Sequence, residues 1–96
     1  MFIVILRFSK NKDQAGKFMD GHKAWITSGF NDGVFLLSGS IQPSSGGAVL
    51  AHNTSYSDLE SRVYDDPFVA ENIVSAEILE IMPGQTGEQL AFLLNM

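Results

Sequence analysis

Residues 2–8, with the sequence FIVILRF, are apolar at almost every position, and this run constrains the fold of the 96-residue chain most strongly. β-Branched and aromatic side chains favour a pleated strand. Because both faces of this strand are apolar, both must be covered, which predicts a central position in a sheet. Arg7 is the exception, and it lies near the end of the strand, where a strand meets solvent or a cleft.

The patterns that follow predict one long helix and three further strands. Apolar positions recur at helical spacing from Ala15 to Ile26, with Asn11 as the predicted N-cap and Gln14 as its partner. Gly29 and residues 31–33 are predicted to end this helix. The remaining predicted elements are strands at 34–41, 48–53 and 73–82, a capping box of Ser57 and Glu60 before a short helix, and helical segments at 67–71 and 87–96.

This order, β-α-β-β-α-β followed by a tail, predicts an α+β fold of the ferredoxin-like class with a four-stranded antiparallel sheet. We assign residues 1–83 to this domain and residues 84–96 to a helical C-terminal tail. Two helices cover only one face of such a sheet. Since 45% of the residues are hydrophobic and only 18% are charged, a second copy of the chain is predicted to cover the open face. The expected partner is therefore the chain itself, in a homodimer on which the tail packs.

The composition argues against several other kinds of partner. The net charge is −5 and the six Lys and Arg residues form no basic face that could neutralise phosphates, so we expect no nucleic-acid binding. The chain has no cysteine, and its two histidines, thirty positions apart, lack the spacing of common metal sites. The first apolar run is too short to span a bilayer. We expect a cytoplasmic protein without metal or cofactor.

His22 is the first candidate for chemistry, because it lies in the middle of the apolar helical stripe. A buried imidazole needs hydrogen-bond partners, and taken alone it is more often a core histidine than a catalytic one. Asp66, within the run Asp65-Asp66-Pro67-Phe68, is first of all a plausible N-cap. A carboxylate near His22 would also orient the imidazole for acid/base catalysis, a proximity that spacing alone leaves open.

The third candidate is the run Ser38-Gly39-Ser40 at the end of an otherwise apolar strand. Small polar residues there indicate either a close approach of a ligand to the backbone or a strand end that frays into a loop. Both interpretations stay open at this point.

Three segments in this order, GHKAWI at 21–26, LLSGS at 36–40 and DDPF at 65–68, resemble the YCII-related (YciI-like) family of the dimeric α+β barrel superfamily. The resemblance covers residues 1–83 and implies two ferredoxin-like sheets packed face to face. It also implies that His22 and Asp66 form a catalytic pair. The family often has an arginine in the turn before the histidine, which this chain lacks, and Arg7 or Lys23 would have to hold an anionic substrate instead.

The resemblance includes a branch similar to muconolactone isomerase-type enzymes that removes chloride from a chlorinated lactone. We therefore predict a cofactor-free lyase, isomerase or dehalogenase-like enzyme acting on a small organic molecule, with Arg7, Ser38, Gly39 and Ser40 as substrate-binding residues. The main alternative is a non-catalytic ligand-binding or accessory homodimer. A cofactor-free monooxygenase of the same superfamily would need a larger, aromatic-lined pocket than the Gly- and Ser-rich strands suggest.

Overall fold

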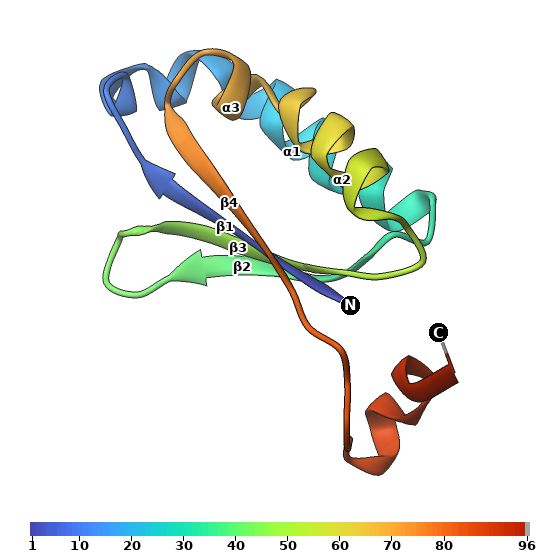
Figure 1. The fold of residues 1–96 in the computed structure, drawn as a ribbon. Coiled ribbons are helices and arrows are strands. Elements are labelled where there is room, and N and C mark those ends of the chain that lie inside the picture. The colour runs from blue at the N-terminus through green and yellow to red at the C-terminus, as the bar shows by residue number, and fades with distance from the viewer. Residues whose placement is uncertain (96) are drawn as a thin grey trace.

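A four-stranded antiparallel sheet is the centre of the computed structural model, which describes residues 1–95 (Figure 1). The strands lie in the order β2-β3-β1-β4, so β1 is central, as its apolar sequence predicts. Their bounds are β1 Phe2–Phe8, β2 Phe35–Ile41, β3 Gly46–Ala51 and β4 Val74–Glu80. Each predicted strand is present, and β3 begins and ends two residues before the predicted bounds.

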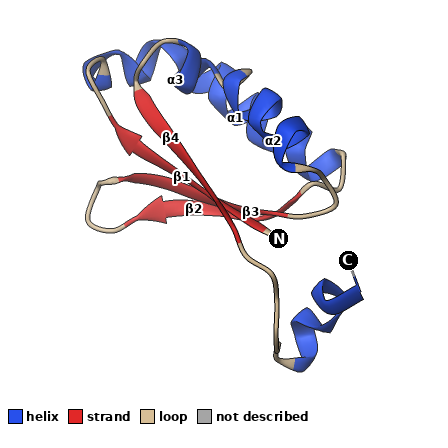
Figure 2. Cartoon of the chain, in the orientation of Figure 1, coloured by secondary structure: helices blue, strands red, loops and turns tan. Residues whose placement is uncertain are grey.

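Three α-helices lie together on one face of this sheet, with no helix over the opposite face among the described residues (Figure 2). They are α1 Ala15–Asn31, α2 Tyr56–Tyr64 and α3 Pro67–Ala70, and the 3-10 helices are η1 Lys12–Gln14 and η2 Glu88–Asn95. Together with the strand order, this arrangement confirms the predicted ferredoxin-like α+β class. It also leaves one sheet face without cover inside the chain.

The alternation of side chains along β1 separates the two faces. Phe2, Val4 and Leu6 are buried beneath the helices, whereas Ile3 and Ile5 point to the opposite face and are only partly buried. The register places Ala51 and Val49 beside Phe2 and Val4 on the helical side. Partners on the open face are Leu50 and Ala48 of β3 and Leu79 and Glu77 of β4. The open face is therefore an apolar band with charged residues toward one end.

The end of α1 at Asn31, within the predicted stop at 31–33, is confirmed, but other predicted helix signals are wrong. Asn11 occupies the N-cap position of η1, which precedes α1, but its side chain makes no capping hydrogen bond, and its amide N–H donates to the backbone oxygen of Glu71 at 2.8 Å. Ser55, not Ser57, caps α2 by accepting from the backbone N–H of Asp58 at 3.1 Å. Gly29 does not end α1 but lies within it and is buried, and a Cβ there would overlap the ring of Phe35. Glycine is needed at this position because α1 packs closely on β2, and not because the helix ends there.

The tail leaves the end of β4 and places η2 away from the three α-helices (Figure 1). Leu93 is buried and the ring of Phe92 lies 5.6 Å from that of His52, so the tail is held on its own chain. Leu90 and Leu94 remain about half exposed. The predicted helix is present as a 3-10 helix, and the division at residue 83 stays a prediction. None of the helices in residues 1–95 is long and apolar enough to cross a bilayer.

Candidate functional site

A cavity of about 340 Å³ lies between the helical layer and the inner face of the sheet. Its apolar walls come mainly from β1, β3 and α3, and include Leu6, Val49 and Phe68. One side is formed by α1, and the other by small residues of β2 and β3. The volume falls within the range of small-molecule pockets, at its lower end.

Four side chains of α1 line this cavity, namely Met19, His22, Lys23 and Ile26. Their spacing is i, i+3, i+4 and i+7, so they form one continuous stripe of the helix. Two of the four are polar or charged, although this face of an amphipathic helix is normally apolar. The middle of this stripe therefore contributes two reactive side chains, His22 and Lys23, to the cavity wall.

The wall opposite α1 is made of small residues, among them Ser38, Gly39 and Ser40 of β2. Ser38 pairs with Val49, and Ser40 with Gly47, so both serines share the inner face with a cavity-lining neighbour. Gly46 has a φ of +129°, and a Cβ there would overlap the backbone oxygen of Leu6. Position 46 requires glycine because β3 approaches β1 so closely there, and the absence of side chains keeps this wall of the cavity thin.

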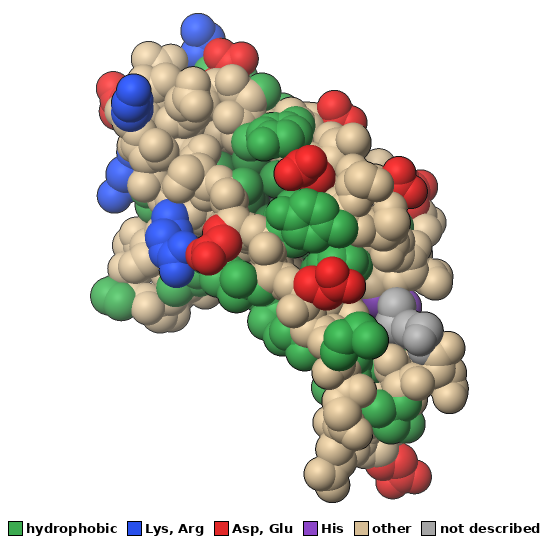
Figure 3. Space-filling view, in the orientation of Figure 1, with side chains coloured by type: hydrophobic (Ala, Val, Ile, Leu, Met, Phe, Trp, Pro, Cys, Tyr) green, Lys and Arg blue, Asp and Glu red, His purple; other side chains and the backbone are tan. Residues whose placement is uncertain are grey.

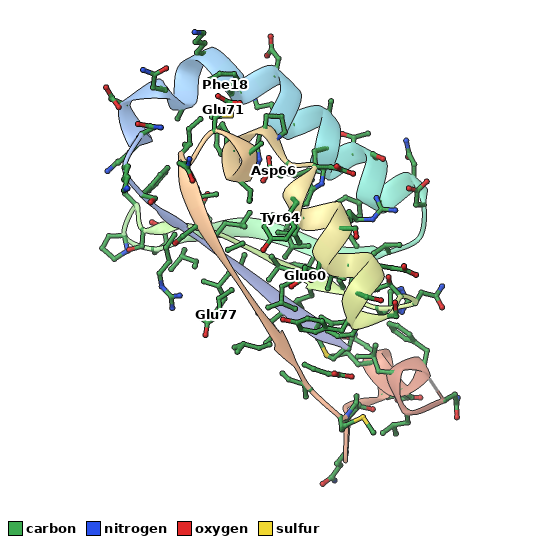
Figure 4. All side chains as sticks on the ribbon, turned by 45° about the horizontal axis from the view of Figure 1, so that its top comes forward. Phe18, Glu60, Tyr64, Asp66, Glu71 and Glu77 are labelled. Carbon is green, nitrogen blue, oxygen red and sulfur yellow. The ribbon has the colours of Figure 1, made fainter. Side chains whose placement is uncertain are left out.

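Asp66 is fully buried, and His22 has 15% of its side chain exposed. His22 Nδ1 lies 2.8 Å from Asp66 Oδ1, across 44 positions of sequence. Asp66 sits at the junction of α2 and α3, where it is the N-cap of α3 (Figure 4). Its Oδ1 also accepts from the backbone N–H of Phe68 at 3.0 Å, while Pro67 occupies the first helical position. The cap therefore holds the carboxylate rigidly against α1.

The imidazole of His22 is also fixed by aromatic contacts. The Phe68 ring stacks on it with centroids 4.0 Å apart and planes 3° apart, and Trp25 lies 6.0 Å away. Because a carboxylate oxygen can only accept, the hydrogen bond to Asp66 places the proton of the neutral ring on Nδ1. Nε2 makes no hydrogen bond to residues 1–95 and is not sealed from solvent. The lone pair at Nε2 is thus available to a ligand.

One oxygen of the pair lacks a partner. Asp66 Oδ2 is buried and accepts no hydrogen bond from the described residues. A buried carboxylate oxygen without a donor is costly, and such groups are concentrated at functional sites and buried water positions. The pair is therefore not optimised for stability alone.

Arg7 does not reach this cavity. It lies on the opposite side of β1 from Leu6, because successive side chains of a strand alternate between faces. Its guanidinium pairs with Glu77 of β4 at 3.0 Å, and both side chains are about half exposed. Figure 4 shows Glu77 on the far side of the sheet from Asp66. Within this chain, the prediction that Arg7 belongs to the His22 site is wrong. The alternation of side chains along β1 already indicates that Arg7 and Leu6 lie on opposite faces of the sheet.

Phe68 has no sequence signal that indicates a role in the site, although its ring stacks on that of His22. It follows Pro67 at a helix start, and only the three-dimensional approach of α3 to α1 reveals the contact. His52 lies outside the cavity lining, against Phe92 of the tail. No group of three or more His, Cys, Asp or Glu residues in 1–95 is arranged to hold a metal ion.

The fold and the cavity define a ferredoxin-like α+β protein with a histidine–carboxylate pair at a small-molecule-sized site. The fold is similar to that of 5-chloro-2-hydroxyhydroquinone dehydrochlorinase (TftG) from Burkholderia phenoliruptrix AC1100, solved in complex with 2,5-dihydroxybenzoquinone. The TM-score is 0.68 at 14% identity, covering 93% of this chain and 98% of that one. No family model and no curated protein matches the chain, so the YciI-like resemblance stays a prediction.

Proposed function

We propose that this protein is an acid/base enzyme that acts on a small organic molecule, with His22 as the proton-transferring group. The hydrogen bond between His22 Nδ1 and Asp66 Oδ1, at the wall of the cavity, is the observation that carries this proposal. General acid/base catalysis needs a base with a free lone pair within reach of the substrate and a partner that orients it. Nε2 of His22 and the carboxylate of Asp66 meet these two requirements.

In this mechanism Nε2 takes a proton from a carbon beside a carbonyl group or from a hydroxyl of the bound molecule. The imidazolium that forms is stabilised by its hydrogen bond to the carboxylate of Asp66. The proton then returns to another atom of the substrate or to a leaving group, which completes an isomerisation or an elimination. Asp66 acts through His22 as a positioning residue, and the stacked Phe68 ring keeps the imidazole plane fixed.

Two further observations support this class of reaction. The dehydrochlorinase with the similar fold processes a small ring compound, which makes a dehydrohalogenase-like, lyase or isomerase activity a reasonable proposal here. The thin wall of Ser38, Gly39 and Ser40 leaves room for a flat ligand facing α1. The proposed proton transfer requires no cofactor.

A screen of small lactones and ring ketones in D₂O tests this proposal, with proton exchange and product formation followed by NMR. The expected result is turnover by the natural chain and its loss in Ser40→Trp, because the indole would fill the cavity. Ser57→Trp, on the exposed start of α2, is the matched control and should retain turnover. Turnover that persists in Ser40→Trp would contradict the assignment of the cavity.

The second candidate function is non-catalytic ligand binding, and one observation favours it. Asp66 caps α3 and is fully buried, so the pair also stabilises the fold. If no compound turns over but one or more raise the Tm of the protein, this second function is correct.

We also propose that the working unit is a homodimer formed through the open sheet face. Leu37 and Leu79 are 51% and 41% exposed there, next to the partly buried Ile3, Ile5 and Leu50. A contiguous apolar band of this kind is typical of an interface between copies of a chain.

Sedimentation equilibrium tests the dimer. The natural chain is expected to sediment as a dimer and Ile3→Glu as a monomer, because the substitution places a charge between Leu50 and Leu79 in the apolar band. Tyr64→Glu adds the same charge on the exposed side of α2, on the helical layer, and should leave the dimer intact (Figure 4). A monomeric natural chain, or a dimeric Ile3→Glu variant, would overturn the proposed interface.

A further inference from the structure

Positive charge is concentrated at the end of the molecule that contains the cavity. Five of the six Lys and Arg residues lie between positions 7 and 23, together with only two acidic residues. The rest of the chain carries one positive side chain, Arg62, and nine Asp and Glu residues. Figure 3 shows the Lys and Arg side chains of that view gathered where β1 ends and α1 begins. An acidic protein with one basic end attracts anions to that end.

Lys23 is the one charged side chain that this basic end contributes to the cavity lining apart from the titratable His22. It follows His22 directly and stands on the same α1 stripe, one turn after Met19 and one before Ile26. It makes no ion pair with any residue of 1–95. Arg62, by contrast, is paired with Asp32 at 2.8 Å. The ammonium of Lys23 is thus available to a ligand.

We infer that the cavity selects small organic acids, with Lys23 binding the anionic oxygen while the apolar body of the ligand rests on Leu6, Val49 and Phe68. This inference rests on the proposed function, because it names the class of substrate for the same site. The shared chemistry is one anionic oxygen, either a carboxylate or an ionised ring hydroxyl, on a small flat skeleton. Lysine suits this role as a flexible point charge that can follow the ligand.

The opposite wall complements this arrangement. The register places the side chains of Ser38 and Ser40 on the inner face, and neither hydroxyl has a hydrogen-bond partner among residues 1–95. Hydroxyl groups donate and accept, so they can bind a second polar group at the far end of the ligand. The predicted ligand is therefore apolar in the middle and polar at both ends.

Titration with benzoate and with its neutral isostere benzamide tests the inference, using the amide ¹H–¹⁵N signals of Gly39, Gly46 and Gly47 as reporters of cavity binding. Benzoate is expected to bind at least about tenfold more tightly than benzamide, the size of difference that one partly exposed charge contact provides. Lys23→Met should abolish this preference and leave benzamide binding unchanged. Lys17→Met, which removes an equal charge from α1 outside the cavity lining, should retain it.

A parallel titration with 4-nitrophenolate, against neutral 4-nitroanisole, separates an ionised hydroxyl from a carboxylate as the preferred anion. The role of Lys23 would be overturned if each anion bound no more tightly than its neutral counterpart. It would also be overturned if the preference for the anion survived in Lys23→Met. His22→Gln should keep the benzoate preference while it loses turnover. Failure of the anion preference and failure of acid/base catalysis are therefore measured separately.

Discussion

Replacing Asp66 with alanine is expected to lower the free energy of unfolding by about 3 kcal/mol. The substitution removes the N-cap of α3, worth about 0.5–2 kcal/mol, and a charge-assisted hydrogen bond to His22 of about 1.5–3 kcal/mol. Because Oδ2 already lacks a partner, its removal recovers part of the cost of burying the carboxylate, which keeps the loss at the lower part of that range. Urea denaturation measures the change.

Two comparison variants separate the causes of this loss. Asp65→Ala changes the exposed neighbouring carboxylate and should stay within about 0.5 kcal/mol of the natural chain. Asp66→Asn keeps an oxygen that can cap α3 and should lose only about 1 kcal/mol, since the charge alone is removed. An Asp66→Ala variant as stable as the natural chain would show that the buried pair does not hold α3 against α1.

Replacing His22 with glutamine is expected to lower turnover by about 10²–10⁴-fold, the usual contribution of a positioned imidazole to proton transfer. Asp66→Asn should also lower it, because a neutral amide oxygen facing Nδ1 stabilises the imidazolium less than a carboxylate does. The two residues act as a unit, so the double variant should be no slower than His22→Gln alone. Steady-state rates on a substrate from the D₂O screen give the comparison, with folding checked by circular dichroism.

His52→Gln is the matched control, since His52 contacts the tail and not the cavity. It should retain the natural rate. Additive losses in the double variant would contradict the pair as a unit, and a fully active His22→Gln would remove His22 from the chemistry altogether.

The sheet and the helical layer could be predicted from the sequence because their signals are local and repeated. The run from Phe2 to Phe8 predicts one strand and the stripe from Ala15 to Ile26 predicts one helix, each from many residues that agree. Helix ends depend on single hydrogen bonds, and the prediction failed at several of them, although the end of α1 at Asn31 and the Asp66 cap of α3 were predicted. Asn11 found a partner in Glu71, sixty positions away, which no local pattern could indicate. Gly29 was misread because its reason is the Phe35 ring packed against it.

The candidate site was less accessible to sequence reasoning. His22 and Asp66 each had an ordinary structural explanation, and their pairing was expected only from the family resemblance. The 2.8 Å contact arises because α3 packs against α1, which is a property of the tertiary fold. Arg7 and Lys23 were equivalent sources of positive charge in the sequence. The alternation of β1 and the helical stripe of α1 place them on different sides of the sheet.

The protonation of the two ring nitrogens of His22, read from ¹⁵N NMR spectra of histidine-labelled protein, tests the central claim most directly. In the neutral ring, Nδ1 should carry the proton and Nε2 the lone pair, and the Nε2 signal should move when benzoate fills the cavity. Asp66→Ala removes the acceptor that faces Nδ1 and should move the proton to Nε2 in part of the population. A natural chain with the proton on Nε2, or with equal populations of both tautomers, would contradict Asp66 as the residue that prepares His22 for acid/base catalysis.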